Sequence, residues 1–321
     1  MLNFLFLQMK HQEKTPEGNI TEFMEFVLLD FADVPHLRWF LFGLFLVIFI
    51  NILMGNGTIF LITKLEPTLQ TPMYFFLGNF SFLEICYVSV TLPRMLVNIW
   101  THRRTISIVA CAAQMCCMFV LGATECVLLA VMAYDRYMAI CNPLHYTLVM
   151  NKKVCVQLVV GSWISGGPVQ IGLTFQIFSL PFCGSNLINH FFCDIPPILR
   201  LACGDTFVNE MMVYIAAVLF AMVPCLLILI SYGKIISTIL KLPSATSRSK
   251  VFSTCSSHIM VVALFFVPGS ITYLRPKPSR SAGADKLLSL FYTIVTSMFN
   301  PVIYSLRNKE VIMALRKLLC K

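Results

Sequence analysis

The sequence has few charged residues. Asp, Glu, Lys and Arg make up only 12% of its 321 residues, whereas hydrophobic residues make up 58%. A soluble domain carries roughly 25% charged residues, so this deficit indicates lipid as the solvent rather than an ordinary globular core. The formal net charge is +9, but the charges lie mostly at the ends of apolar runs. That placement indicates membrane lipid as a partner and argues against nucleic acid.

Motifs of catalysis and metal binding are also missing. The chain has no GxGxxG, GxSxG, HExxH or P-loop pattern, no CxxC pair and no zinc spacing. We therefore predict that it is not an enzyme and that it needs no cofactor, with a sodium ion as the one exception discussed below. It also lacks the internal repeat that many transporters contain, which argues against a transporter or channel as the alternative function.

The sequence contains long runs of apolar residues. A membrane-spanning helix needs about 20 mostly apolar residues, and seven stretches qualify: Trp39–Thr63, Met73–Asn98, Val109–Tyr134, Val154–Leu180, Met211–Gly233, Val251–Leu274 and Leu287–Leu306. The runs do not alternate, so we predict helices rather than the strands of a barrel. The predicted fold is an all-α membrane protein, a seven-transmembrane helix bundle (39–306) between an N-terminal tail (1–38) and a C-terminal tail (307–321).

The N-terminal tail indicates the orientation. Seven spans place the two termini on opposite sides, and Lys and Arg are slightly in excess on the side of the C-terminus, which is typical of the cytoplasm. Asn19-Ile20-Thr21 is a glycosylation sequon that can be used only outside the cell. Residues 1–9 are apolar but lack a charged n-region and a cleavage site, so we interpret them as tail rather than signal peptide. We predict an extracellular N-terminus with a glycan on Asn19.

Two short motifs carry the clearest functional signal. Met132-Ala133-Tyr134-Asp135-Arg136-Tyr137 lies at the inner end of the third span, and Asn300-Pro301-Val302-Ile303-Tyr304 lies in the seventh. Pro301 has no N–H, so the helix can bend there. Each motif alone has an equally good structural explanation, as a charged helix end or as a proline of the kind common in membrane helices.

Together, and in this order, the motifs resemble those of rhodopsin-like G-protein-coupled receptors, and longer segments resemble the olfactory receptors among them. The segments are Gly55-Asn56, Pro72–Leu77, Met132–Cys141, Leu144–Tyr146, Trp163, Pro224, Phe252–His258 and Asn300–Asn308. The resemblance covers about residue 19 to the C-terminus. Four residues depart from it without removing a functional group: Asp30, Met138, Val251 and Ser297.

The resemblance implies an odorant pocket in the outer half of the third, fifth, sixth and seventh spans. The residues expected to bind the ligand are Met118, Phe119, Gly122, Ala123, Phe266, Ser270 and Tyr273. For each of them, packing between helices explains the residue type as well as ligand contact does. No pocket position of the third span is charged, so the expected ligand is a small volatile odorant, neutral and mostly apolar.

The resemblance also implies coupling to a heterotrimeric stimulatory G protein of the olfactory type, which raises cyclic AMP. The residues expected to carry activation are Asp135, Arg136, Tyr137, Tyr232, Asn300, Pro301 and Tyr304. Arg136 would contact the G protein after leaving an exposed, and therefore weak, ion pair with Asp135. The competing explanation is that Arg136 only anchors the span at the cytoplasmic surface.

Four cysteines on one side of the predicted bundle could form disulfide bonds. Cys183, Cys193 and Cys203 share the long loop after the fourth span, and Cys111 begins the third span. Four thiols allow three pairings, which sequence alone leaves open. The resemblance selects Cys111–Cys193 and Cys183–Cys203.

Glu84 and Glu125 are carboxylates inside predicted spans, where an unpaired charge is costly. By resemblance they face each other near Asn56 and Asn300, where they could share a proton or hold a sodium ion. Two separately protonated glutamates are the alternative. His258 is a lone histidine in the sixth span, for which a hydrogen-bonded role is expected rather than metal binding.

The C-terminal segment has the pattern of a short cytoplasmic amphipathic helix. In Met313–Lys321, leucines alternate at helical spacing with basic residues, which is typical of a helix that lies on the inner leaflet. Cys320 could be palmitoylated or remain a free thiol. Together with the resemblance, this segment predicts a multi-pass protein of the plasma membrane.

Overall fold

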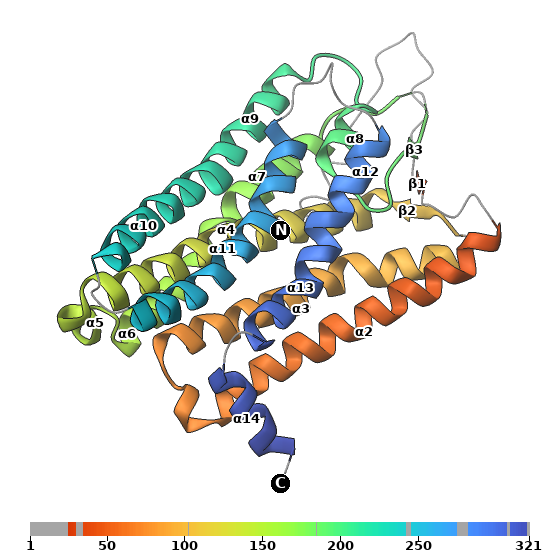
Figure 1. Ribbon diagram of the computed structural model, residues 1–321. Helices are drawn as coiled ribbons and strands as arrows, with labels where there is room; N and C mark the ends of the chain where they lie inside the picture. Colours follow the sequence, from red (N-terminus) through yellow and green to blue (C-terminus); the bar gives the residue numbers. More distant parts are fainter. Residues whose placement is uncertain are drawn as a thin grey trace.

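The computed structural model describes residues 25–29, 35–101, 103–183, 185–241, 245–274, 282–306 and 309–319. Seven helical segments of this part of the chain are long and apolar enough to cross a membrane. They lie together as an elongated bundle (Figure 1), so the predicted seven-helix fold is confirmed. Asn19 and Cys320 lie outside the described residues, as do the side chains of Tyr273 and Tyr304.

Four spans are continuous helices: α2 (Pro35–Leu65), α3 (Pro72–Thr101), α4 (Ile108–Cys141) and α11 (Ala245–Leu274). The other three are interrupted. The fourth consists of α6 (Lys152–Ser165) and α7 (Gly167–Phe178). The fifth consists of α9 (Phe207–Ala217), the π-helical turn η2 (Val218–Met222) and α10 (Val223–Leu240). The seventh consists of α12 (Ala282–Leu290), the π-helical turn η4 (Phe291–Val295) and α13 (Thr296–Leu306).

The interruptions coincide with residues that disturb a regular helix. Gly166 separates α6 from α7, and Pro168 follows in the first turn of α7. Pro224 lies in the first turn of α10, directly after η2. Pro301 lies inside α13, where a carbonyl loses its helical N–H partner. Because π-helical turns inside α-helices are frequent at functional sites, η2 and η4 make the fifth and seventh spans candidates for a functional role.

Close packing holds the first and seventh spans together. A Cβ at Gly55 of α2 would lie only 3.0 Å from the ring atoms Cβ and Cγ of Pro301 in α13. A larger residue would push the helices apart at this point. The Gly55-Asn56 and Asn300-Pro301 motifs, distant in sequence, therefore meet in the bundle.

A small β-sheet closes one end of the bundle, which we call the sheet end. It consists of β1 (Glu25–Leu28), β2 (Thr105–Ser107) and β3 (Leu187–Ile188) in the order β2-β1-β3. β1 is antiparallel to β2 and parallel to β3. The sequence analysis did not predict these strands. Because β1 pairs with β3, the segment before the first span and the long loop after the fourth lie at the same end, as expected.

The sheet end has a hydrophobic core of its own. Phe26 and Leu28 of β1 are fully buried there, with Cys193 and residues of α4 and of the short helix α8 (Ile195–Leu199). A larger cluster fills the space between the spans. The loop residues of the sheet end are therefore packed as part of the folded core.

The last helix, α14 (Lys309–Leu319), lies at the opposite end. It begins four residues before the predicted amphipathic segment and buries Val311 and Ala314. The hydroxyl of Tyr74 in α3 donates to Glu310 Oε2 at 2.7 Å, and Lys317 Nζ donates to Glu66 Oε1 at 2.9 Å. These contacts tie α14 to the turn between the first two spans, next to the 3-10 turn η1 (Pro67–Leu69).

Candidate functional site

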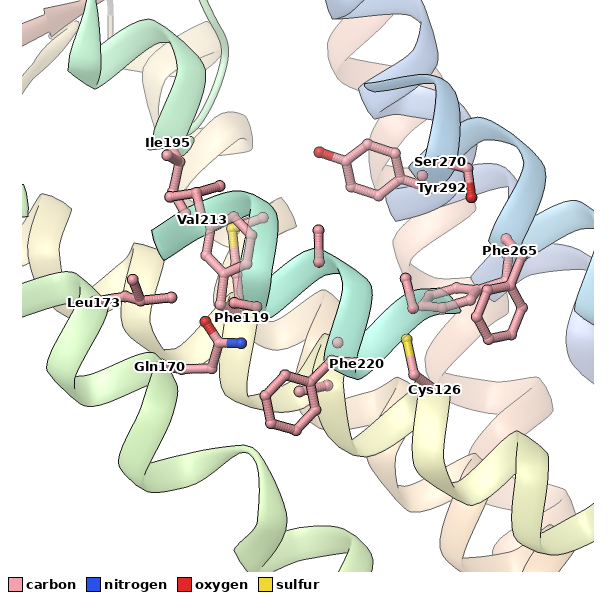
Figure 2. A pocket seen from close by; sticks show the side chains of 18 of the residues that line it. Phe119, Cys126, Gln170, Leu173, Ile195, Val213, Phe220, Phe265, Ser270 and Tyr292 are labelled. Carbon is pink, nitrogen blue, oxygen red and sulfur yellow. The ribbon is translucent and has the colours of Figure 1, made fainter. Parts of the chain in front are cut away.

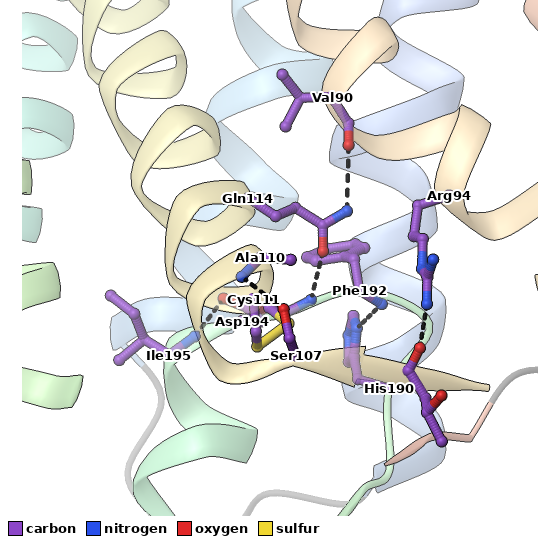
Figure 3. The surroundings of a disulfide bond; sticks show 12 residues. Val90, Arg94, Ser107, Ala110, Cys111, Gln114, His190, Phe192, Asp194 and Ile195 are labelled. Atoms are coloured by element: carbon purple, nitrogen blue, oxygen red, sulfur yellow. Dashed lines mark hydrogen bonds between the residues drawn. A yellow bond between two sulfur atoms is a disulfide. The ribbon is translucent and has the colours of Figure 1, made fainter. Parts of the chain in front are cut away.

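The long loop is attached to the bundle by a disulfide bond. The structure pairs Cys111 with Cys193, with 5.5 Å between their Cα atoms, and Cys183 with Cys203, with 5.9 Å. This is the pairing that the resemblance implied. Cys193 N–H also donates to Gln114 Oε1 at 3.2 Å, and Gln114 Nε2 donates to the carbonyl of Val90 in α3 at 3.1 Å (Figure 3). The loop is therefore fixed to both α3 and α4.

A cavity of about 130 Å³ lies between the spans, next to α8 of the loop. Six of the seven expected ligand residues line it: Met118, Phe119, Gly122, Ala123, Phe266 and Ser270. The side chain of the seventh, Tyr273, is outside the described residues. No described lining residue is Asp, Glu, Lys, Arg or His. The cavity therefore suits a neutral and largely apolar molecule.

Several lining residues were missed by the sequence analysis. They come from α3, α4, α7, α8, α9, η2, α11 and η4, and include Tyr87, Gln170, Leu173, Ile195, Phe220 and Tyr292 (Figure 2). The fourth span contributes because Gly166 lets it approach α4, since a Cβ there would lie 2.6 Å from Cβ of Ala123. One signal was present in the sequence, namely Gln170, a polar residue in a span without charged residues.

Hydrogen bonds connect the cavity wall with the loop. The Tyr292 hydroxyl lies 3.3 Å from both Asp194 Oδ2 and Ser289 Oγ, and its one proton is donated to the Asp194 carboxylate. Phe192 N–H donates to His190 Nδ1 at 3.5 Å, so His190 Nε2 carries the ring proton and donates to Ser289 Oγ at 3.0 Å. Burial, together with the nearby positive charge of Lys286, lowers the pKa of His190 to about 3. His190 is therefore neutral at physiological pH, and Tyr292 is fixed from the loop side.

The Asp135-Arg136-Tyr137 motif lies at the α14 end of α4. Asp135 accepts a hydrogen bond from the Tyr146 hydroxyl at 2.9 Å, from the short helix α5 (Pro143–Val149). The side chains of Asp135 and Arg136 are only 2% and 7% exposed. The expectation of an exposed pair was therefore wrong, because the neighbouring helices cover both residues. The small energies measured for exposed pairs do not apply here.

A hydrogen bond joins the fifth and sixth spans near this motif. Tyr232 of α10 is buried, and its hydroxyl lies 2.8 Å from Nδ1 of His258 in α11. The prediction that His258 has a hydrogen-bonded role is confirmed. Tyr232, expected to move during activation, is held against α11 in this structure.

Glu84 and Glu125 come together in the middle of the bundle. Both are buried, and Glu84 Oε2 and Glu125 Oε1 have no hydrogen-bond partner among the described residues. Asn300 Nδ2 donates to Glu84 Oε1. Asn56, expected nearby, donates its amide to the carbonyl of Ile52 in its own helix. Among the described residues, no cluster of three or more His, Cys, Asp or Glu is placed to hold a metal ion.

Comparisons with known proteins agree with this architecture. The sequence profile described as "Olfactory receptor" matches residues 45–321. The chain is 63% identical over 298 residues to human olfactory receptor 10AG1, which covers 93% of this chain and 99% of that protein. It is 50% identical over 293 residues to human olfactory receptor 10A7, covering 91% of this chain and 93% of that protein.

Proposed function

This chain belongs to the olfactory receptor family, whose members are G-protein-coupled receptors and not enzymes, and from this premise we propose its ligand class and its signalling partner. The chain is an odorant-sensing receptor of the membrane. We propose that it binds a small, neutral, mostly apolar volatile in the cavity beside Gly122. We further propose that binding activates a stimulatory G protein and raises cyclic AMP. The observation that carries the ligand class is the uncharged lining of the described cavity.

A ligand can activate the receptor only if it binds the active arrangement more tightly than the resting one. The cavity touches η2 and η4, the two π-helical turns that interrupt the fifth and seventh spans. A ligand that presses on Phe220 of η2 or Tyr292 of η4 would bias the positions of α10 and α13. Movement of α10 and α11 apart would break the Tyr232–His258 hydrogen bond and uncover Arg136 for the G protein. Tyr137, Pro301 and Tyr304 belong to the same proposed activation set.

We also propose that the receptor resides in the plasma membrane with its sheet end outside the cell. This orientation would expose Asn19 to glycosylation and place the disulfide bonds in an oxidising compartment. It would put α14 on the inner leaflet, where Arg316 and Lys317 could meet anionic lipid headgroups.

For Glu84 and Glu125, we propose a shared proton or a bound sodium ion that stabilises the resting state. The burial of both carboxyl groups, each with one oxygen that has no hydrogen-bond partner among the described residues, supports the proposal. Glu84→Gln and Glu125→Gln should each change basal activity or sodium sensitivity. If basal cyclic AMP, ligand potency and sodium sensitivity all stay at wild-type values in both variants, this role is wrong.

The proposed function is tested with cells that express the full chain and report cyclic AMP. Neutral volatiles of different chain length and functional group are compared with charged amines and carboxylates of matched size. We expect responses to some neutral compounds and none to the charged ones. A response confined to charged compounds, or a fall in cyclic AMP on activation, would contradict the proposal.

A further inference from the structure

The side-chain amide of Gln170, which lines the cavity, has no hydrogen-bond partner among the described residues. Gln170 of α7 is 5% exposed and lines the cavity. Its backbone carbonyl accepts a hydrogen bond from Thr174 Oγ1 at 2.8 Å, but its side-chain amide makes no hydrogen bond within the described residues. Figure 2 shows the amide extending from α7 toward Phe119, which lines the same cavity. A buried amide without a partner is unfavourable, so this position is costly unless something in the cavity satisfies it.

The backbone around Gln170 holds the amide in this place. Gln170 N–H donates to the carbonyl of Gly166 at 3.0 Å, in the first turn of α7. Gly166 in turn packs against Ala123 so closely that no larger residue fits without movement. The amide is therefore positioned one helical turn beyond a tight contact between the third and fourth spans. It cannot easily withdraw from the cavity to find another partner.

Two other polar side chains of the cavity wall, Tyr292 and Ser270, are placed differently. The hydroxyl of Tyr292 already donates to Asp194 and is in hydrogen-bond contact with Ser289 Oγ. Ser270 comes from α11, on the other side of the cavity from α7 (Figure 2). Near Gln170 the wall is formed by apolar side chains such as Leu173 and Phe220. Since the described part of the chain offers the amide no partner, the contents of the cavity are its source of one.

The chemistry of the amide restricts what that partner can be. A glutamine amide presents an acceptor, Oε1, and a donor, Nε2–H, side by side. A hydroxyl group can donate to the first and accept from the second. A carbonyl group can only accept and leaves Oε1 unsatisfied, and a hydrocarbon satisfies neither atom.

We infer that Gln170 is a specificity-determining residue that selects odorants carrying a neutral hydroxyl group over carbonyl compounds and hydrocarbons with the same carbon skeleton. The inference rests on the proposed function, because it assumes that odorants bind in this cavity. Without an odorant, the amide meets water, and an alcohol replaces that water with its own hydroxyl while its carbon chain contacts the phenylalanines.

The test uses the full-length receptor in cells with a cyclic AMP readout. The probes are straight-chain alcohols from n-hexanol to n-decanol, the matched aldehydes and the matched alkanes. The variant is Gln170→Met, which keeps an unbranched side chain but removes both polar atoms. The control is Gln157→Met, the same change on the exposed surface of α6 in the same span. Heat inactivation of the unliganded receptors is measured in parallel.

For the wild type and the control, we expect the alcohols to be the most potent members of each matched set. In Gln170→Met, the potency of the alcohols should fall by about tenfold to hundredfold, the cost of an unmade hydrogen bond, while the alkanes and aldehydes change little or gain. Heat inactivation of Gln170→Met should occur at the wild-type temperature or above it, because no protein partner is lost.

Three results would overturn the inference. One is an alcohol preference that survives unchanged in Gln170→Met. Another is a wild-type receptor that prefers aldehydes or alkanes at every chain length. The third is a lower inactivation temperature for Gln170→Met than for Gln157→Met, which would show that the amide supports the fold. A wild-type receptor that responds to charged compounds and to none of these neutral ones would contradict the proposed function, and the inference depends on that function.

Discussion

The disulfide bond between Cys111 and Cys193 should contribute more to the stability of this receptor than the one between Cys183 and Cys203. The first closes a loop with a sequence separation of 82 residues and the second one of 20. The loss of chain entropy on cross-linking corresponds to about 4.5 kcal/mol for the longer loop and about 3.3 kcal/mol for the shorter. These are upper limits, because helices that stay inserted in the bilayer already restrict the unfolded chain.

Packing increases the difference between the two bonds. Cys111 and Cys193 are both fully buried in the core of the sheet end. Without the bond, Cys193 would remain joined to α4 by the hydrogen bond from its N–H to Gln114, and a single hydrogen bond contributes only about 1 kcal/mol. The loop carries Ile195 and Asp194, so its loosening would also open the cavity wall and release Tyr292.

The assay compares two double variants, so that no single thiol is left to form a wrong pair. Cys111→Ala with Cys193→Ala should strongly reduce surface expression, lower the temperature of heat inactivation and reduce odorant potency. Cys183→Ala with Cys203→Ala should have the smaller effect on all three. If the Cys111/Cys193 variant reaches the surface at the wild-type level and responds with unchanged potency, the reasoning from loop length and burial is refuted.

Three further predictions concern other parts of the molecule. Arg136→Ala should leave the surface level unchanged and abolish the cyclic AMP response; a reduced surface level with a normal response per receptor would instead show that Arg136 only anchors the span. A methyl group added at Gly122 would meet open space, whereas one added at Gly166 would lie 2.6 Å from Ala123 Cβ. Gly166→Ala should therefore lower the stability of the fold by about 1–3 kcal/mol. Gly122→Ala should leave heat stability intact and weaken only bulky odorants, and equal heat stability of the two variants would disprove this packing argument. Burial lowers the pKa of His190 to about 3, so protonation of this side chain favours the unfolded state. The free energy of unfolding should therefore fall as the pH drops from about 6.5 toward 3, and the loss should reach about 2 kcal/mol at pH 5. In His190→Gln this part of the pH dependence should vanish from heat-inactivation curves, and identical curves for both receptors would contradict it.

Local composition was enough to predict the number and type of the spans. Each span must satisfy its own backbone hydrogen bonds and present apolar side chains to lipid, so the information lies within about 20 consecutive residues. The sequence also indicated that Asp135, Arg136 and the Asn300-Pro301 pair are special. It could not give their surroundings, and the assumption that the Asp135–Arg136 pair is exposed failed, because burial depends on which helices lie next to it.

The sheet end shows why some elements could not be predicted. The strands β1, β2 and β3 are only two to four residues long, and each pairs with a segment far away in the chain. A hydrophobic alternation over so few residues carries little signal. Their formation is decided by the disulfide bond and the buried contacts of Phe26 and Leu28, which exist only once the bundle has formed.

By itself, the sequence therefore determined that this protein is a seven-helix membrane receptor, and through its resemblance which cysteines should pair. Only the tertiary structure decided how the cavity is built. The fourth span contributes Gln170 to it because Gly166 permits a close approach to Ala123. The seventh contributes Tyr292 because a π-helical turn and the loop residue Asp194 direct its ring. These positions depend on distances between segments separated by many residues, and the physical reason is that packing, unlike helix formation, is not a local property of the chain.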